Sequence, residues 1–292
     1  MKGGVIQAQR VGRAREASPV RLCARQERLL AGRSRWMQVF AVVFAALALG
    51  VAASGYILTG GRGVQTFART AASLLQLVVL LVPLTALVMG AMALASDRGA
   101  AELLYSQPVD RRRVLLGRLL GLFEAMVGAQ AIGFGLAGMV IFTQAGGEGF
   151  GGFMGLVGAS VVLTAVFLAI AAAIASAAVG ERRTRALATA IVVWFAAALL
   201  FDVAALGIAS LLRSGAASRV LMTAALVNPI DAVRTGTLLL VEGTAAFGAA
   251  SLALLRFTRG PEGAFALIAL SVLVWTAVPL WIAGRRLERV DL

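Results

Sequence analysis

The chain has 292 residues, 60% of them hydrophobic and only 14% charged, and its mean hydropathy of +0.90 is typical of a polytopic membrane protein. The net charge of +13 does not indicate a nucleic-acid partner, because the arginine-rich N-terminal arm has no interleaved aromatic residues and no binding module. With no histidine, one cysteine and one lysine, the chain cannot build a Ser-His-Asp or Cys-His nucleophile or a His/Cys metal cage.

Six apolar runs define the expected architecture. A helix rises about 1.5 Å per residue and the hydrocarbon layer is about 30 Å thick, so roughly 20 apolar residues cross it. The runs cover residues 36–58, 71–95, 119–143, 152–179, 186–212 and 264–283. They lack the two-residue alternation of barrel strands, so the predicted fold class is an all-α membrane protein with six transmembrane helices.

The N-terminal region and the arginines indicate an orientation. Residues 1–21 form a basic leader that we expect to be disordered, and residues 22–292 form one transmembrane domain whose first span is an uncleaved signal-anchor. With a cytoplasmic N-terminus, the cytoplasmic side holds Lys2 and nineteen arginines, while the other side holds seven. Both termini, and with them Cys23, are therefore predicted to be cytoplasmic.

The loop after the second run is the most structured sequence outside the apolar runs. A short helix is expected over residues 99–106, with Glu102 beside Leu103 and Leu104 on one side. Pro108 then stops this helix, and Asp110 is placed to cap the next one, whose basic start is residues 111–113. The segment is either an ordinary interfacial turn or a docking element for a soluble partner.

Two acidic residues lie inside apolar runs, where charge is a functional hypothesis by default. Glu124 lies about 9 Å deeper along a helix than Arg118, near enough to the interface to be partly hydrated, and we favour a structural role. Asp202 lies in the outer half of the fifth run. It either lines a polar passage, or it caps a helix or pairs with an arginine of the outer loop.

Small residues and proline mark further local features. The spacing Gly117-x-x-x-Gly121 allows close helix packing, but in a chain with 33 glycines it arises readily by chance, so no dimer face is assigned.

Asn228-Pro229 favours a break between two outer half-helices. Residues 235–255 are apolar enough for a seventh span. A re-entrant or interfacial helix pair is preferred, because Asp231, Arg234 and Glu242 interrupt the segment and a seventh span would place the C-terminal arginines outside.

The loop residues resemble the coupling segment of type-two ABC permeases. The matching positions are Arg98, Gly99, Glu102, Leu103, Leu104, Ser106, Pro108, Val109, Arg111, Gly117 and Arg118. The sequence departs from that pattern at Ala100, Asp110 and Arg118, and none of these changes removes the amphipathic character.

Two further segments narrow the resemblance to a subgroup. Residues 25–36 are similar to the interfacial helix that precedes the first span of such permeases, through Arg25, Glu27, Arg33, Arg35 and Trp36. Residues 193–195, 201–202 and 226–234 resemble the permeases of nitrous oxide reductase maturation systems, and this outer segment includes Asn228, Pro229, Asp231 and Arg234.

The resemblance implies an ATP-driven exporter subunit of the inner (cytoplasmic) membrane that supports the assembly of a periplasmic copper enzyme. Expected partners are a cytoplasmic ABC ATPase, which would hold the ATP and Mg²⁺, a second copy of the chain, a periplasmic β-helical protein and a copper chaperone. The chain itself has no Walker A motif, no histidine and a single cysteine. We therefore expect no enzyme activity, cofactor or metal site in it. A generic exporter of a lipid, drug or antibiotic and a non-transporting assembly scaffold are the alternatives.

Overall fold

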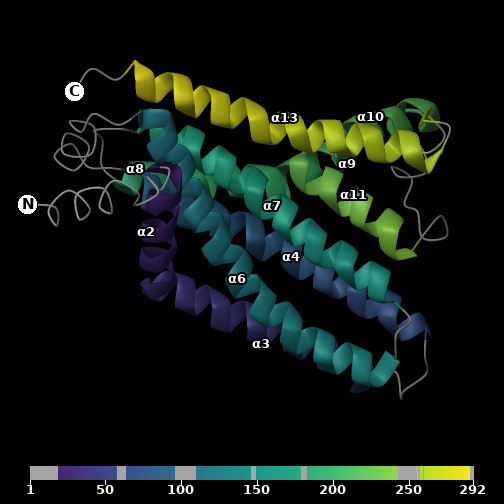
Figure 1. Cartoon of the computed structure of the whole chain (residues 1–292). Helices are drawn as coiled ribbons and strands as arrows, with labels where there is room; N and C mark the ends of the chain where they lie inside the picture. Colours follow the sequence, from purple (N-terminus) through teal and green to yellow (C-terminus); the bar gives the residue numbers. More distant parts are fainter. Residues whose placement is uncertain are drawn as a thin grey trace, which may run out of the picture.

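The structure is a computed structural model, which describes residues 19–57, 64–95, 110–145, 149–178, 183–242, 255, 257–258 and 260–289. These residues are almost entirely helical, and six helices are long and apolar enough to cross a membrane (Figure 1). They are α3 (Arg35–Ile57), α4 (Val64–Leu94), α6 (Arg111–Ala145), α7 (Phe150–Ala177), the continuous α8 (Arg183–Phe195), η1 (Ala196–Leu200) and α9 (Phe201–Ser210), and α13 (Pro261–Glu288). The all-α fold class and the six predicted spans are confirmed.

The central helix of the bundle is α7, which packs against α4, α6, α11 and α13. Its side chains Leu163 and Phe167 are completely buried. One buried polar contact joins it to α6: the Gln130 amide donates to Thr164 at 2.9 Å, and the Ser160 hydroxyl donates to Gln130 at 2.5 Å. In lipid, apolar burial hardly favours contact between two helices over contact with acyl chains. Side-chain hydrogen bonds of this kind therefore help to hold membrane helices together.

Both ends of the described chain lie at one end of the bundle. The N-terminal helix α2 (Pro19–Arg33) crosses this end nearly at right angles to the spans, and α13 finishes beside it (Figure 1). The same end carries the first residues of α6 and α8 and therefore a concentration of arginines, among them Arg111, Arg112 and Arg183. We call it the basic end.

The boundaries of α2 correct two sequence-based expectations. The helix begins at Pro19, so residues 19–21 belong to it and not to the leader. A break at Ser34 ends it, because the Ser34 N–H bonds Ala31 O at 3.0 Å and α3 starts at the next residue. Arg35 therefore lies on the first span and not on the interfacial helix, and Trp36 follows it there, as the apolar run from residue 36 predicts.

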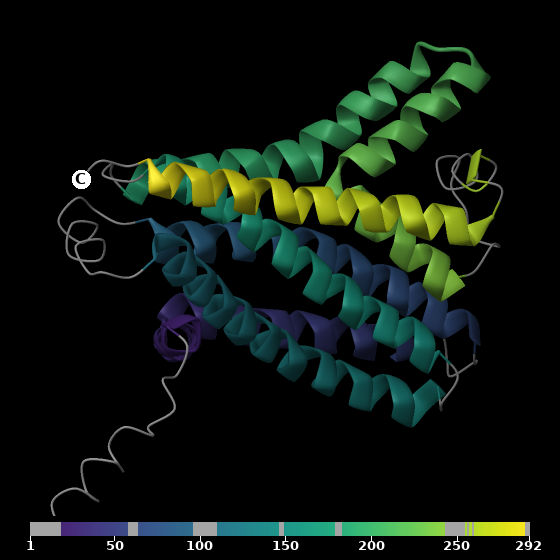
Figure 2. The ribbon, with the colours of Figure 1, turned by 45° about the horizontal axis from the view of Figure 1, so that its top comes forward.

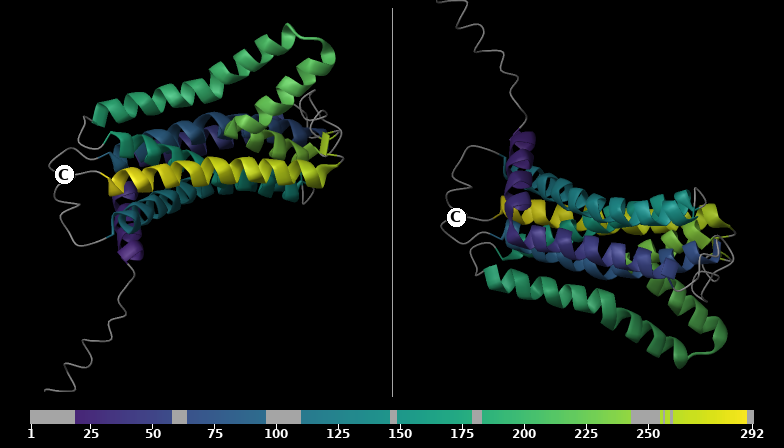
Figure 3. Two further views of the ribbon diagram at one scale, coloured as in Figure 1. Left: turned by 90° about the horizontal axis from the view of Figure 1, so that it is seen from above. Right: turned by 90° about the horizontal axis from the view of Figure 1, so that it is seen from below.

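A helix pair before the last span forms a hairpin that does not cross the bundle. The chain direction turns by 102° between helix α10 (Ser214–Val227) and helix α11 (Pro229–Glu242). From the end of α9, α10 runs back to about half the depth of the bundle, and α11 returns towards the end from which α10 started (Figures 2 and 3). The described part of the pair is re-entrant, as predicted from the charged residues Asp231 and Arg234, which interrupt the apolar segment. The remainder of the possible seventh span, residues 243–254, lies outside the described residues.

Candidate functional site

The expected coupling segment lies mostly outside the described residues. Its structure at residues 96–109, which include Arg98, Gly99, Glu102, Leu103, Leu104 and Pro108, stays a prediction. What the structure shows is how the two flanking helices are held at the basic end. Helix α4 leads into the segment, and α6 leads out of it.

The start of α6 is capped and tied to the last span. The Arg112 N–H donates to the Asp110 carboxylate at 3.0 Å, which is the N-cap predicted from the sequence. Arg111 donates to the carbonyl of Leu287 at 2.8 Å, and the Arg112 guanidinium binds the Glu288 carboxylate at 2.7 Å. The last carbonyls of a helix have no partner of their own, so Arg111 satisfies one of them while it joins α6 to α13.

The end of α4 is tied to two other helices. The guanidinium of Arg118, two turns further along α6, donates to the carbonyl of Ala93. Arg183, at the start of α8, donates to the carbonyl of Ala95 at 3.1 Å. The residues that flank the segment on both sides are therefore fixed to α6, α8 and α13.

Helix α2 is docked on α6 through two glycines. A Cβ atom on Gly117 would lie 2.6 Å from the Cβ of Cys23, and one on Gly121 would lie 2.8 Å from the Cβ of Glu27. Real Cβ contacts are not this short, so the absence of side chains at these two positions lets the helices approach. The Gly117-x-x-x-Gly121 spacing is thus a docking site for α2 within one chain.

Two ion pairs fix the register of α2 on α6. Glu27 is 8% exposed and accepts from Arg118 at 3.1 Å, so this pair is shielded from water. Arg28 binds Glu124 at 2.9 Å, and both of these side chains are about half exposed. Glu124 thus joins α6 to α2 through this ion pair, and the structural role favoured from its sequence position stays a prediction. Of the remaining α2 positions, Arg25 and Arg33 are exposed.

The second group of polar residues lies where the hairpin breaks. Asn228 caps α11: its side-chain oxygen accepts from the Ile230 N–H at 3.1 Å, and Pro229 occupies the first helical position, where a missing N–H costs nothing. The Asn228 amide donates to the carbonyl of Ala197 at 2.8 Å and to Asp231 at 2.9 Å. Ala197 lies in η1, a π-helical turn near the middle of the fifth span.

Helix α13 completes this junction from the other side. The carbonyls at the end of α10 are orphaned by the break. Ser271 donates to Leu226 O at 2.6 Å, and the Trp275 indole N–H donates to Val227 O at 2.8 Å. The hairpin apex is therefore hydrogen-bonded to both the fifth and the sixth span.

Asp202 pairs with the hairpin. Arg234 on α11 lies 3.5 Å from Asp202 on α9 and 3.1 Å from Asp231 one turn earlier. The predicted pairing of Asp202 with an outer arginine is confirmed in the geometry. Two carboxylates share one guanidinium here, so the cluster keeps one excess negative charge when all three groups are ionised.

Several contacts have no clear signal in the sequence. Nothing in the local sequence singles out Gln130, Ser271 or Trp275, and the π-helical turn lies in an ordinary run of alanine and leucine. Within the residues that the structure describes, no three His, Cys, Asp or Glu side chains gather as metal ligands. The cluster at the hairpin thus holds itself together by hydrogen bonds and one arginine.

Comparisons with known proteins agree on the class of this chain. The family described as "ABC-2 family transporter protein" matches residues 24–292. The protein named "Probable ABC transporter permease protein NosY" in Pseudomonas aeruginosa is 33% identical over 264 residues, which cover 88% of this chain and 91% of that protein. A protein of the same name in Stutzerimonas stutzeri is 33% identical over 258 residues, covering 86% of this chain and 91% of that one.

Proposed function

Because the chain belongs to the ABC-2 family of transporter permeases, we propose that it is the membrane subunit of an ATP-driven exporter that supports maturation of a periplasmic copper enzyme of the nitrous oxide reductase type. The similarity to proteins named NosY over most of both chains supports the choice of subgroup. The basic end faces the cytoplasm in this proposal, since arginine-rich loops stay on that side.

The proposal rests on the contacts that hold the two helices flanking the coupling segment, α4 and α6, to each other and α6 to α13. In our account a cytoplasmic ATPase, with its own ATP and Mg²⁺, binds residues 96–113 together with α2. Force on the segment then reaches α6 through the Asp110 cap, α13 through Arg111 and Arg112, and α4 through Arg118. Because these contacts join the three spans around one short segment, closing of the ATPase moves them together.

A second copy of the chain is part of the proposed assembly. The α8–α9 span leans away from the other helices over its second half (Figure 3). It presents a row of exposed apolar side chains, which are Val192, Phe195, Leu199, Leu200, Val203 and Leu206. A partner copy on this face would bury them. A periplasmic β-helical protein and a copper chaperone would act at the opposite end, where the hairpin opens.

Two experiments test this function. The tagged chain, purified from its native host in mild detergent, is expected to bring down a nucleotide-binding subunit in equal amount. Purification without any such subunit would instead favour an assembly scaffold. Deletion of the gene is then expected to leave a periplasmic copper enzyme without its metal, while a strain that loses export of an unrelated lipid or drug and keeps the copper enzyme would contradict the subgroup.

A further inference from the structure

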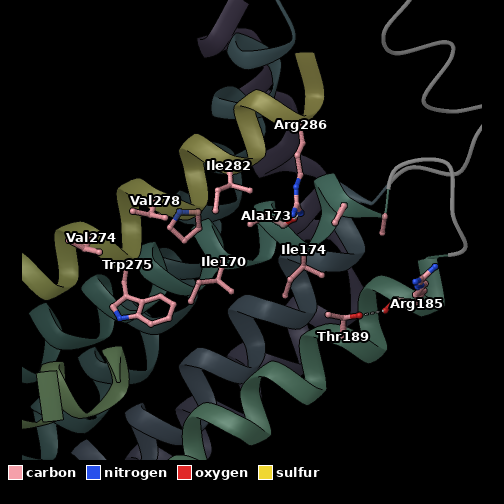
Figure 4. A pocket seen from close by; sticks show the side chains of 13 residues that line it. Ile170, Ala173, Ile174, Arg185, Thr189, Val274, Trp275, Val278, Ile282 and Arg286 are labelled. Carbon is pink, nitrogen blue, oxygen red and sulfur yellow. Dashed lines mark hydrogen bonds between the residues drawn. The ribbon is translucent and has the colours of Figure 1, made fainter. Parts of the chain in front are cut away.

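A groove of about 550 Å³ lies between the last two spans, on the half of the bundle nearest the basic end. Helix α7 forms its floor, and α8 and α13 form its walls (Figure 4). Its lining is mainly aliphatic and includes Ile170, Ala173, Ile174, Val274, Val278 and Ile282. A volume of this size is that of an ordinary small-ligand site.

The two ends of the groove differ in chemistry. At the basic end each wall of the groove carries an exposed arginine, Arg185 at the start of α8 and Arg286 near the end of α13 (Figure 4). The Arg286 guanidinium lies over the floor, where it donates to the carbonyl of Ala173 at 3.4 Å. At the other end the groove stops at Trp275, whose indole N–H is bonded to the hairpin apex.

The length of the groove matches one leaflet of a bilayer. From Trp275 to Arg286 a helix rises roughly 17 Å at about 1.5 Å per residue. Half of the hydrocarbon layer is about 15 Å thick. A chain lying against α13 would therefore start beside the arginines at the interface and end near the middle of the membrane.

We propose that this groove binds one anionic phospholipid of the leaflet at the basic end. The phosphate lies between Arg185 and Arg286, and an acyl chain lies along Ile174, Val274 and Val278. An arginine on each wall of an apolar groove between spans matches an anionic headgroup and its chain, because guanidinium groups form charge-assisted hydrogen bonds with phosphate oxygens. A soluble phosphate compound would use the arginines and leave the apolar length of the groove without a role.

The binding test uses the full chain, purified with any associated subunit and equilibrated with mixed vesicles of phosphatidylglycerol and phosphatidylcholine. Lipids that stay bound after transfer to detergent are counted by native mass spectrometry. We expect one retained phosphatidylglycerol per chain. The double variant Arg185→Gln with Arg286→Gln should retain at least about tenfold less of it, since two headgroup contacts are lost. Arg285→Gln is the matched control, because Arg285 is the adjacent residue but stacks on Trp281 at 4.1 Å.

A second variant tests the apolar part of the groove. Val278 is 47% exposed, so Val278→Trp fills the groove without disturbing the buried core. It should lower retention of phosphatidylglycerol although both arginines are kept, because the acyl chain no longer fits. These readouts do not require transport, so they stand apart from the proposed function.

Three results would overturn the proposal. The first is wild-type retention of phosphatidylglycerol in the double arginine variant. The second is binding of inorganic phosphate to the purified chain, abolished by the arginine variant, with no lipid retained. The third is an efficient disulfide between two copies of a Cys23→Ser, Val278→Cys chain, which would show that a second copy fills the groove.

Discussion

The Asn228 side chain has three hydrogen-bond partners, two on α11 and one on the π-helical turn of the fifth span, and this makes it the residue on which the hairpin depends most. It caps α11 through Ile230, holds the π-helical turn through Ala197, and restrains Asp231. The side chain is 3% exposed, so a lost partner is not replaced readily by water. The cap of α11 and its contact with the π-helical turn therefore both rest on one amide.

We predict that Asn228→Ala lowers the stability of the purified chain by about 2 kcal/mol, because it removes a cap and two further hydrogen bonds. Asn228→Ser should recover part of that loss, since serine also caps helices. Thermal unfolding in detergent, followed by circular dichroism, measures both. Equal melting temperatures for Asn228→Ala and the wild type would contradict the role assigned to this residue.

Asp202 attaches the hairpin to the fifth span at a second point, through Arg234. Its carboxylate lies 3.5 Å from Arg234, and an amide can replace much of this hydrogen bonding. Asp202→Asn should therefore keep the fold and much of the activity, whereas Asp202→Leu should lower the yield of folded protein by leaving Arg234 with fewer partners. Loss of transport in a folded, ATPase-bound Asp202→Asn protein would show that the charge itself belongs to the pathway.

At the scale of the element, the docking of α2 on α6 depends on the two glycines that face it. A methyl group at Gly121 would lie 2.9 Å from the backbone nitrogen of Arg28, and backbone cannot move aside as a flexible side chain can. Gly128 lies two turns further along α6, and a methyl group there would meet no atom of another element within 4 Å. The two positions therefore respond to the same substitution in opposite ways.

We predict that Gly121→Ala loosens α2, while Gly128→Ala raises helix stability by up to about 1 kcal/mol through helix propensity alone. Cys23 reports on the difference, since it packs against Gly117 on the same face and is only partly exposed. Its rate of maleimide labelling in detergent should rise several-fold in Gly121→Ala and stay unchanged in Gly128→Ala. Equal rates in the two variants would exclude glycine-mediated docking.

The spans are predictable from the sequence because length and apolarity alone decide whether a helix crosses a bilayer. The hairpin is predictable for a local reason, the helix-breaking Asn228-Pro229 pair. The contacts between α2 and α6 are not predictable from the sequence. The Glu27–Arg118 pair forms only at the close approach that the two glycines permit. The junction of Trp275 with Val227 joins positions far apart in the chain, and no local pattern indicates such a contact.

The position of the basic end predicts the orientation of the whole chain in the membrane. Helix α2 and the end of α13 lie at this end, so the positive-inside rule predicts that Cys23 faces the cytoplasm (Figure 1). An impermeant thiol reagent should leave Cys23 unmodified in intact cells and label it after permeabilisation. A cysteine introduced at Leu211, which is 87% exposed at the opposite end, is the matched control and should label in intact cells. Labelling of Cys23, but not of the cysteine introduced at Leu211, in intact cells would show that the chain has the opposite orientation in the membrane.

The central claim is that an ATPase drives this permease through the segment that begins after α4. The direct measurement is permease-dependent ATP hydrolysis and transport by the complex reconstituted in proteoliposomes. We predict that Glu102→Lys, which reverses a charge beside Leu103 and Leu104, leaves membrane insertion intact and uncouples hydrolysis from transport. Glu262→Lys makes the same charge change at the exposed start of α13, at the other end of the bundle, and should behave as the wild type. Normal transport-stimulated ATPase activity in Glu102→Lys would contradict the claim.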